Sequence, residues 1–491
     1  MKPLKQYKFW LVVGSQHLYG EEALRQVRKN AEIVAKGLDA SEKVPAEVLF
    51  KGVATTPEEI ADICRNANYD EDCTGVITWC HTFSPSKMWI AGLTILQKPW
   101  LQLHTQFNLE IPADTIDMDF MNLNQAAHGD REHGFIGTRL RKNRKVVVGY
   151  WEDEDTARKI GGWMRSAVGA SVSRKLKLVR FGDNMRQVAV TEGDKVEAEI
   201  VLGWSVNTFG VGDLVEYVNK VSKADVDAKM KEYQDKYDMD TDMLASVEYQ
   251  GKMEIAIERL LQDKDANAFT TNFEDLHGLE QLPGLAAQNL MAKGYGFGGE
   301  GDWKVSALTY LMKKMAAGKE LGTSFMEDYT YDFTKGSERI LGAHMLEICP
   351  SISKDRPKVQ VHPLGIGGKA DPARLVFDGK EGSAIVVSLV DMGGRLRMIV
   401  NDIECTKPPH MPKLPVARAM WKPMPDLQTS AEAWILAGGA HHSVLSYDLN
   451  AEHMRDFAEI MDIEFVHIHK GTCISQLKQE LFFADLAWKL K

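Results

Sequence analysis

The stretch that decides the fold runs from Phe9 to Leu38 and reads FWLVVGSQHLYGEEALRQVRKNAEIVAKGL. Its apolar start, FWLVVG, predicts a buried strand. The apolar residues that follow recur at helical spacing, at Leu24, Val27, Ala31, Val34 and Leu38. A strand that leads into an amphipathic helix is the repeating unit of a parallel α/β sheet.

The same alternation continues through the first third of the chain. Further strands are predicted at AEVLFKGV, GVITWC, WLQLHT and KVVVGYW. Between the first two of these lies a predicted helix, for which Thr56 is the expected N-cap and Pro57 the first helical residue. We therefore expect a doubly wound parallel sheet. Ligands bind outside the carboxyl ends of such strands, and three of these ends carry the polar triplets SQH, CHT and HTQ.

The pattern of apolar and turn-forming residues changes after Gly322. Before it, LKLVRFGDN and AEIVLGW predict strands, and VGDLVEYVNKVSKADVDAKMKEYQDKY predicts a long helix. Beyond it, short alternating segments punctuated by Gly, Pro and Asp predict an antiparallel sandwich or barrel. At 491 residues the chain exceeds a single core, so we expect three domains. These are an α/β domain of Rossmann or flavodoxin type (residues 1–172), a central α/β domain (173–320) and a β-barrel-like domain (321–491).

Composition narrows the class of protein. The net charge of -10 argues against nucleic acid or an anionic membrane as the main partner. The six cysteines form no Cys-x-x-Cys pair, which is typical of a reduced, cytoplasmic protein. The apolar run at Phe9–Val13 is too short for a signal-peptide core, and no run approaches the roughly 20 residues that span a bilayer.

A glycine-rich loop, KGYGFGGEGDWK, surrounds Glu300. Loops of this composition commonly bind phosphate, but a carboxylate in the loop would repel it. Glycine also lets the backbone approach a ligand closely. We therefore interpret the loop as a device that brings the Glu300 carboxylate into a crowded site.

Two further polar residues occur on predicted apolar faces. Strand alternation places Glu327 beside Phe325 on one face, and it places His344 among apolar residues of ERILGAHMLEI. A Glu–His hydrogen bond in the core is the simple explanation. However, Glu300 and the pair His441–His442 add to a set of carboxylates and imidazoles without thiolate. Such a set suits Mn²⁺, Mg²⁺, Co²⁺ or Fe²⁺ with positions left open for a substrate.

Two other classes of protein fit the sequence less well. A nicotinamide-dependent oxidoreductase would carry G-x-G-x-x-G after a strand, and VVGSQHLYG lacks that spacing. An exported sugar-binding protein would usually carry an export signal and would not need the acidic and imidazole set. From the residues alone, a divalent-metal site and a buried Glu–His hydrogen bond both stay open.

Six long motifs resemble the L-arabinose isomerase family: VGSQHLYGEE, MDFMNLNQAAHGDREHG, GFGGEGDW, GTSFMEDYTY, GAHMLE and AWILAGGAHH. The resemblance runs nearly from end to end. It implies a metal-dependent aldose–ketose isomerase of L-arabinose catabolism that converts L-arabinose to L-ribulose, and commonly D-galactose to D-tagatose. It also implies a homo-oligomer, a hexamer or a tetramer. A relative that acts on fucose or another sugar is the rival within the same class.

The resemblance also implies roles for individual residues. The metal ligands would be Glu300, Glu327, His344 and His442, holding one Mn²⁺ per subunit with Co²⁺ or Mg²⁺ as substitutes. His442 is preferred to His441 because of the way GGAHH aligns with the family pattern. Glu300 and Glu327 would act as base and acid through a cis-enediol, with a metal-assisted hydride shift as the alternative.

Substrate contacts are implied in both halves of the chain. The resemblance assigns them to Gln16, Leu18, Gln125, His128, Tyr329 and His441. Gln125 and His128 would act across a subunit boundary, so that sites are shared between subunits. The alternatives are that Tyr329 packs in the barrel and that His128 stabilises a turn.

Overall fold

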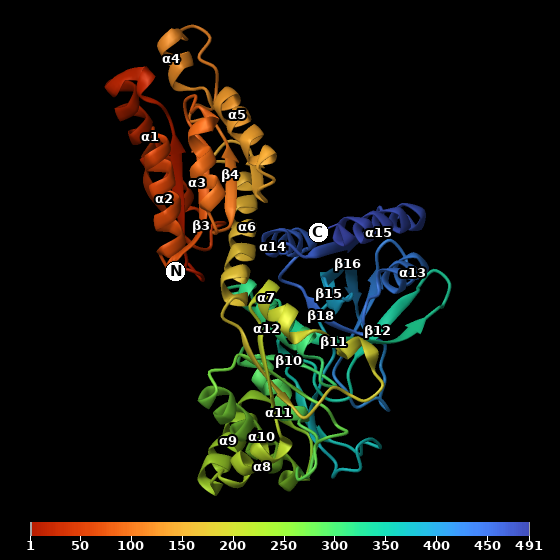
Figure 1. The fold of residues 1–491 in the computed structure, drawn as a ribbon. Coiled ribbons are helices and arrows are strands. Elements are labelled where there is room, and N and C mark those ends of the chain that lie inside the picture. The colour runs from red at the N-terminus through yellow and green to blue at the C-terminus, as the bar shows by residue number, and fades with distance from the viewer. Residues whose placement is uncertain (1, 491) are drawn as a thin grey trace. The chain divides into compact units, whose positions relative to one another are not determined.

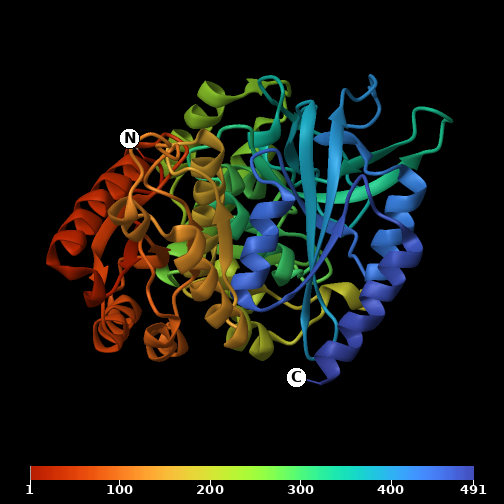
Figure 2. The same cartoon turned by 90° about the horizontal axis from the view of Figure 1, so that it is seen from above.

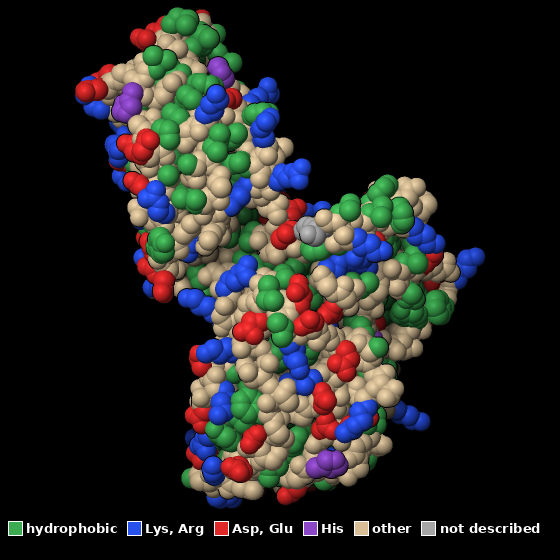
Figure 3. All heavy atoms as spheres, viewed as in Figure 1, with side chains coloured by type: hydrophobic (Ala, Val, Ile, Leu, Met, Phe, Trp, Pro, Cys, Tyr) green, Lys and Arg blue, Asp and Glu red, His purple; other side chains and the backbone are tan. Residues whose placement is uncertain are grey.

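The computed structural model describes residues 2–490, which fall into two compact units. The first unit ends at Ser171 and the second begins at Val172. No helix within the described residues is long and apolar enough to cross a membrane. On the face drawn in Figure 3, acidic and basic side chains are interspersed.

The first unit is built on a five-stranded parallel sheet in the order β2-β1-β3-β4-β5, with helices packed along it (Figure 1). The strands are β1 (Lys8–Gly14), β2 (Glu47–Ala54), β3 (Cys73–Cys80), β4 (Trp100–His104) and β5 (Lys145–Val148). The helices are η1 (His17–Tyr19), α1 (Gly20–Ala40), α2 (Pro57–Tyr69), η2 (Ser86–Trp89), α3 (Ile90–Ile95), α4 (Met118–Leu123), α5 (Ala126–Arg139) and α6 (Glu154–Ser173). The predicted doubly wound sheet is confirmed.

The inner strand β1 is buried on both faces, which explains why it is apolar from Phe9 to Val13 rather than alternating. Successive residues of β1 point to opposite faces. Phe9 meets Trp163 of α6, with ring centroids 5.4 Å apart, and Trp10 joins a cluster that contains Ile60 of α2. The predicted N-cap is also confirmed, because the Thr56 side chain accepts a hydrogen bond from the first turn of α2.

The second unit begins with a four-stranded parallel sheet in the order β10-β9-β6-β7. Its strands are β6 (Lys177–Phe181), β7 (Ser205–Phe209), β9 (Ala268–Thr271) and β10 (Gly296–Gly298). The helices around it are η3 (Ala189–Thr191), α7 (Lys195–Leu202), α8 (Val211–Asn219), α9 (Lys223–Lys236), α10 (Leu244–Asp263), α11 (Gly284–Ala292) and α12 (Trp303–Met315).

The strand predicted over AEIVLGW is wrong, because most of this segment belongs to α7. Asp194 caps the helix by accepting hydrogen bonds from the amides of Val196 and Glu197. Gly203, at φ 80°, ends it in the left-handed conformation. The single long helix predicted after it is two helices, α8 and α9, because Ser222 starts a new one with a capping box.

The last third of the chain forms a closed antiparallel barrel. Its six strands follow one another as β15-β18-β11-β12-β17-β16, and β16 pairs again with β15 to close the ring. They are β11 (Thr323–Asp332), β12 (Arg339–Ala343), β15 (Gly382–Asp391), β16 (Leu396–Thr406), β17 (Arg418–Pro423) and β18 (His442–Ser446). The expected antiparallel β domain is therefore confirmed as a barrel.

Smaller elements surround the barrel, with helices of the C-terminal part of the chain along its outside (Figure 2). They are β19 (Glu464–Ile468), which pairs in parallel with β16, and the helices η4 (Pro350–Ile352), α13 (Leu427–Ala437), α14 (Ala451–Met461) and α15 (Ile474–Lys489). A separate three-stranded sheet consists of β8 (Asp238–Met239), β13 (Lys358–Val361) and β14 (Ala373–Val376). How the second unit divides into domains remains a prediction.

Candidate metal centre

Glu300 lies in the tight turn between β10 and α12, with φ of 64° in the left-handed region. Its glycine neighbours are closely packed. A Cβ on Gly299 would lie 3.1 Å from the ring of His344, and one on Gly301 would lie 2.5 Å from Cα of Asn184. The glycines therefore allow the loop to bring the carboxylate up to the barrel, as the sequence indicated.

Strand register brings Glu327 next to two histidines. On β11, Glu327 pairs with Ala343, the last residue of β12, and with His442, the first residue of β18. His344 follows Ala343 directly. Two strands and the residue that follows a third thus bring these side chains to the same end of the barrel.

The faces predicted for β12 and β11 are partly wrong. β12 ends at Ala343, so the alternation that was expected to continue through His344 stops before it. The ring of His344 packs against Phe325, with centroids 5.1 Å apart. In β11 the register shifts between Asp328 and Thr330, so a bulge at Tyr329 interrupts the alternation that places Phe325 and Glu327 on one face.

Five side chains form two overlapping groups that share His442. Glu300, His344 and His442 each present an atom within 4.8 Å of the others, and so do Glu327, His441 and His442. The Glu300 carboxylate lies 3.8 Å from Nε2 of His442, and the Glu327 carboxylate lies 4.0 Å from Nε2 of His344. The separations are too long for hydrogen bonds and leave space between the groups.

Two further carboxylates hold the histidine rings from behind. Nδ1 of His344 lies 2.5 Å from Oε2 of Glu347, and Nδ1 of His442 lies 3.2 Å from Oδ2 of Asp302. Both histidines then leave Nε2 buried without a hydrogen-bond partner. Buried polar atoms are normally paired. Two unpaired ring nitrogens that face carboxylates therefore favour a site for a cation.

Sequence reasoning missed Asp302 and Glu347. Each lies within a motif that was singled out, GFGGEGDW and GAHMLE, at two and three residues from a predicted ligand. Asp302 also caps α12 by accepting from the amides of Lys304 and Val305. Its cap position was a usable signal for the start of a helix, but the pairing with His442 depends on a strand far along the chain.

Charges at the site favour ionised carboxylates. Burial raises the pKa of Glu300, but the hydrogen bond from His441 and the charges of the nearby imidazoles outweigh it and lower the pKa. Burial lowers the pKa of His344, but Glu347, Glu327 and Glu300 together outweigh it and raise the pKa to about 9. The hydrogen bond to Glu300 raises the pKa of His441. Carboxylates held ionised in a buried cluster are suited to bind a cation.

A cavity of about 620 Å³ opens beside these residues. Tyr329 and His344 line it, together with mostly apolar side chains. Tyr329 is 51% exposed, so it is not packed within the barrel. His441 lies 3.5 Å from the Glu300 carboxylate. Both residues predicted to contact substrate in this part of the chain are therefore near the cluster.

The other predicted contacts lie together in the first unit. Gln16 and Leu18 follow β1, and Leu18 is 83% exposed. Gln125 precedes α5, and its side-chain oxygen lies 3.4 Å from the hydroxyl of Tyr19, next to Leu18. His128 packs against the ring of Phe83, with centroids 4.7 Å apart. These residues form a polar, largely exposed face near the carboxyl ends of β1 and β3.

Family comparisons cover nearly all of the chain. The model of the L-arabinose isomerase N-terminal domain matches residues 3–175. The model of the L-arabinose isomerase central domain matches residues 177–318, and that of the C-terminal domain matches residues 322–464.

Individual relatives align over their whole length. The chain is 58% identical to the L-arabinose isomerase of Geobacillus kaustophilus, in an alignment 496 positions long that covers 100% of each chain. It is 57% identical to the L-arabinose isomerase of Anoxybacillus flavithermus, with 99% of each chain covered. It is 56% identical to that of Klebsiella pneumoniae subsp. pneumoniae, again with 99% of each chain covered.

Proposed function

The chain belongs to the L-arabinose isomerase family and is an isomerase, and on this premise we propose that it converts L-arabinose to L-ribulose with the help of a divalent metal ion. Its place would be in L-arabinose catabolism. Mn²⁺ is the ion we propose, at one per subunit, with Co²⁺ or Mg²⁺ as substitutes. The proposed ligands are Glu300, Glu327, His344 and His442.

One observation carries the metal proposal. The buried Nε2 atoms of His344 and His442 lack hydrogen-bond partners and face the two carboxylates. An oxygen and nitrogen donor set without sulfur suits Mn²⁺, Co²⁺ or Mg²⁺ rather than a softer metal. Asp302 and Glu347 orient the two rings, because each lies within hydrogen-bond distance of an Nδ1 and leaves Nε2 turned toward the carboxylates.

The chemistry requires a proton to move between C2 and C1 of the open-chain sugar. When bound, the ion would act as a Lewis acid toward the sugar oxygens. Glu300 and Glu327 are the residues we propose as base and acid, passing through a cis-enediol. Both side chains are mostly buried, at 11% and 17% exposed, so water competes little with the sugar for them.

An isotope experiment separates this route from a hydride shift. With the reaction run in D₂O, proton transfer predicts deuterium at C1 of the ketose. Complete retention of the substrate's own C2 hydrogen at C1 would instead support the hydride shift and remove the acid–base role of the two glutamates.

D-Galactose is a second proposed substrate, giving D-tagatose. It has the configuration of L-arabinose at C2, C3 and C4, and differs by an added hydroxymethyl group. The 620 Å³ cavity lined by Tyr329 gives room for that group, since ligand pockets commonly span about 300–1,000 Å³.

We also propose that Gln16, Leu18, Gln125 and His128 contact the sugar bound by a neighbouring copy of the chain, in a hexamer or tetramer. The exposure of Leu18 supports a role in binding rather than in the core. If so, dilution into monomers should abolish most activity. A fully active monomer would remove this part of the proposal.

The decisive experiment measures L-ribulose formation by protein stripped of metal with EDTA, before and after Mn²⁺ is added. Activity that returns only with the ion would support both the reaction and the metal. Undiminished activity in the stripped protein would contradict the metal role alone. If neither form acts on L-arabinose, the substrate is wrong, and L-fucose and D-galactose should be tested.

A further inference from the structure

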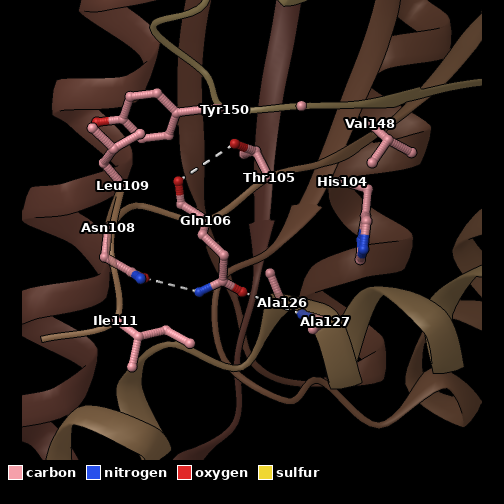
Figure 4. A pocket seen from close by; sticks show the side chains of 11 residues that line it. His104, Thr105, Gln106, Asn108, Leu109, Ile111, Ala126, Ala127, Val148 and Tyr150 are labelled. Carbon is pink, nitrogen blue, oxygen red and sulfur yellow. Dashed lines mark hydrogen bonds between the residues drawn. The ribbon is translucent and has the colours of Figure 1, made fainter. Parts of the chain in front are cut away.

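A second cavity lies wholly within the first unit, at the carboxyl ends of β4 and β5 (Figure 4). Its volume is about 360 Å³, near the lower end of the range of about 300–1,000 Å³ for small-molecule sites. Ligands of parallel α/β sheets bind at this edge. None of the residues assigned above to the metal or to the sugar lines it, although Ala126 and Ala127 of the lining lie between Gln125 and His128 in the sequence.

The lining carries hydrogen-bonding groups with donors to spare. The Gln106 amide donates to Oδ1 of Asn108 at 3.0 Å, and the Asn108 amide donates to the carbonyl of Glu110 at 3.1 Å. Each amide nitrogen carries two hydrogens, so each keeps one donor for a ligand. Figure 4 shows both side chains reaching into the space below Tyr150.

An oriented imidazole adds an acceptor. Nδ1 of His104 lies 3.3 Å from Oδ2 of Asp130, whose side chain is fully buried. The other oxygen of Asp130 accepts from the amide of Cys80 at 2.9 Å. A carboxylate behind the ring keeps the proton on Nδ1 and leaves Nε2 as an acceptor.

The charge of the lining decides the class of ligand. No Lys, Arg, Asp or Glu lines the cavity. The first turn of α5 could offer an amide to a phosphate, but the amide of Ala127 already donates to Oε1 of Gln106 at 3.2 Å. A phosphorylated or strongly charged ligand therefore lacks partners here.

Apolar side chains border the same space. Leu109, Ile111 and Val148 are 68%, 74% and 61% exposed. Aliphatic side chains match the C–H faces of a sugar, and neutral amides and imidazole match its hydroxyls. This mixture is what a neutral polyhydroxylated molecule requires.

We propose that this cavity is a second binding site, for a neutral sugar or sugar alcohol of pentose to hexose size. It is separate from the proposed metal centre and does not depend on the reaction assigned to it. Its occupant need not be turned over, because no pair of acid and base groups faces the space.

The test fills the cavity without touching the metal centre. Val148→Trp places a large ring in it from an exposed position, where a substitution is expected to leave folding nearly unchanged. The matched control is Val146→Trp, two residues earlier on β5, on the same face and outside the lining. Equilibrium dialysis with radiolabelled L-arabinitol, which cannot isomerise, counts bound molecules per chain.

We expect the wild-type chain and Val146→Trp to bind one equivalent more than Val148→Trp, with the isomerase rate unchanged in all three. Asn108→Ala should weaken binding at this site by about fivefold, the effect of one lost hydrogen bond. Equal binding by Val148→Trp and wild type would overturn the proposal. Equal binding together with a smaller assembly mass for Val148→Trp would overturn it in favour of a contact between copies.

Discussion

Buried histidines of the two units have opposite surroundings. His81 and His133 of the first unit, and His344 and His442 of the second, each leave one ring nitrogen without a hydrogen bond. Burial lowers the pKa of His81 to about 4 and that of His133 to about 3. Burial acts in the same direction on His344, but nearby glutamates, chiefly Glu347, outweigh it and raise the pKa to about 9. Burial alone therefore does not mark a site.

The neighbours explain the difference. The rings of the first unit contact neutral groups: Nε2 of His81 lies 2.8 Å from the Asn30 amide, and Nε2 of His133 lies 3.0 Å from the Thr78 hydroxyl. The rings of the second unit have carboxylates on both sides. A buried imidazole is a candidate metal ligand when its unpaired nitrogen faces one carboxylate and a second carboxylate contacts its other nitrogen.

The largest effect should come from the two carboxylates that face the unpaired nitrogens. Glu300→Gln or Glu327→Gln should lower kcat for L-arabinose by about 10²–10⁴-fold, the usual contribution of a general acid or base. Ketose formation measures it. The matched control is Glu404→Gln, a barrel glutamate that pairs only with the Ser383 hydroxyl and should keep full activity. A near-normal rate in either variant would refute the role of that residue.

Replacing one buried histidine in each unit tests directly whether their surroundings decide metal binding. His344→Asn should weaken Mn²⁺ binding by more than about 100-fold, because it removes a proposed ligand rather than a residue behind one. His133→Asn should bind Mn²⁺ normally and lose only thermal stability. Electron paramagnetic resonance of free Mn²⁺ gives the binding, and circular dichroism gives the melting temperature. Equal Mn²⁺ affinity in the two variants would contradict the proposal that His344 binds the ion and His133 does not.

The carboxylates behind the rings should matter less. Asp302→Asn should weaken Mn²⁺ binding by about 10–100-fold. Asn keeps an oxygen to cap α12, but it no longer offers a carboxylate to Nδ1 of His442. Asp194→Asn is the control, because Asp194 caps α7 without a histidine. A similar small loss in both variants would show that capping alone explains the effect.

Lowering the pH should reduce the free energy of unfolding, because buried histidines of the first unit are neutral in the fold. His133 stays uncharged in the fold because of burial and the nearby Arg144 charge, and its pKa is lowered to about 3. The unfolded chain takes up a proton below about pH 6.5, so the free energy of unfolding falls as the pH falls from about 6.5 toward 3. By about pH 5 the loss is about 2 kcal/mol for this ring.

Denaturant unfolding of wild type and His133→Gln at about pH 7.5 and pH 5 measures that loss. The difference in stability between the two proteins should shrink by about 2 kcal/mol at the lower pH. A difference that does not change with pH would mean that His133 takes up its proton equally readily in the folded and the unfolded chain, which would contradict the lowered pKa.

The sequence predicted local structure well where the pattern is periodic. The strand at Phe9 and the helix after Thr56 were recognised from spacing and capping. α7 was missed because its apolar residues are too dense to show a helical period, and the signals that settle it are the caps Asp194 and Gly203. Propensity alone does not distinguish a short buried helix from a strand.

The sequence indicated some features of the site and missed others. The side chains of Glu300, Glu327, His344 and His442 fall in two overlapping groups that share His442, but the strand in which periodicity placed His344 ends one residue before it. The end of β12 at Ala343 and the bulge at Tyr329 come from pairing with distant strands, which no local pattern contains. The same limit hid the contact between Asp302 and His442, which are separated by 140 residues.

Glu300 has a consequence for how this chain would respond to selection. Its φ of 64° is a conformation that costs a residue with a side chain roughly 1–2 kcal/mol and costs glycine almost nothing. The turn around it is already rich in glycine, so Glu300→Gly would relax the backbone and remove a partly buried charge. A screen for heat resistance alone would therefore favour a change that destroys the proposed catalyst. At this position stability and activity are opposed, and retaining glutamate there means that thermal stability is given up.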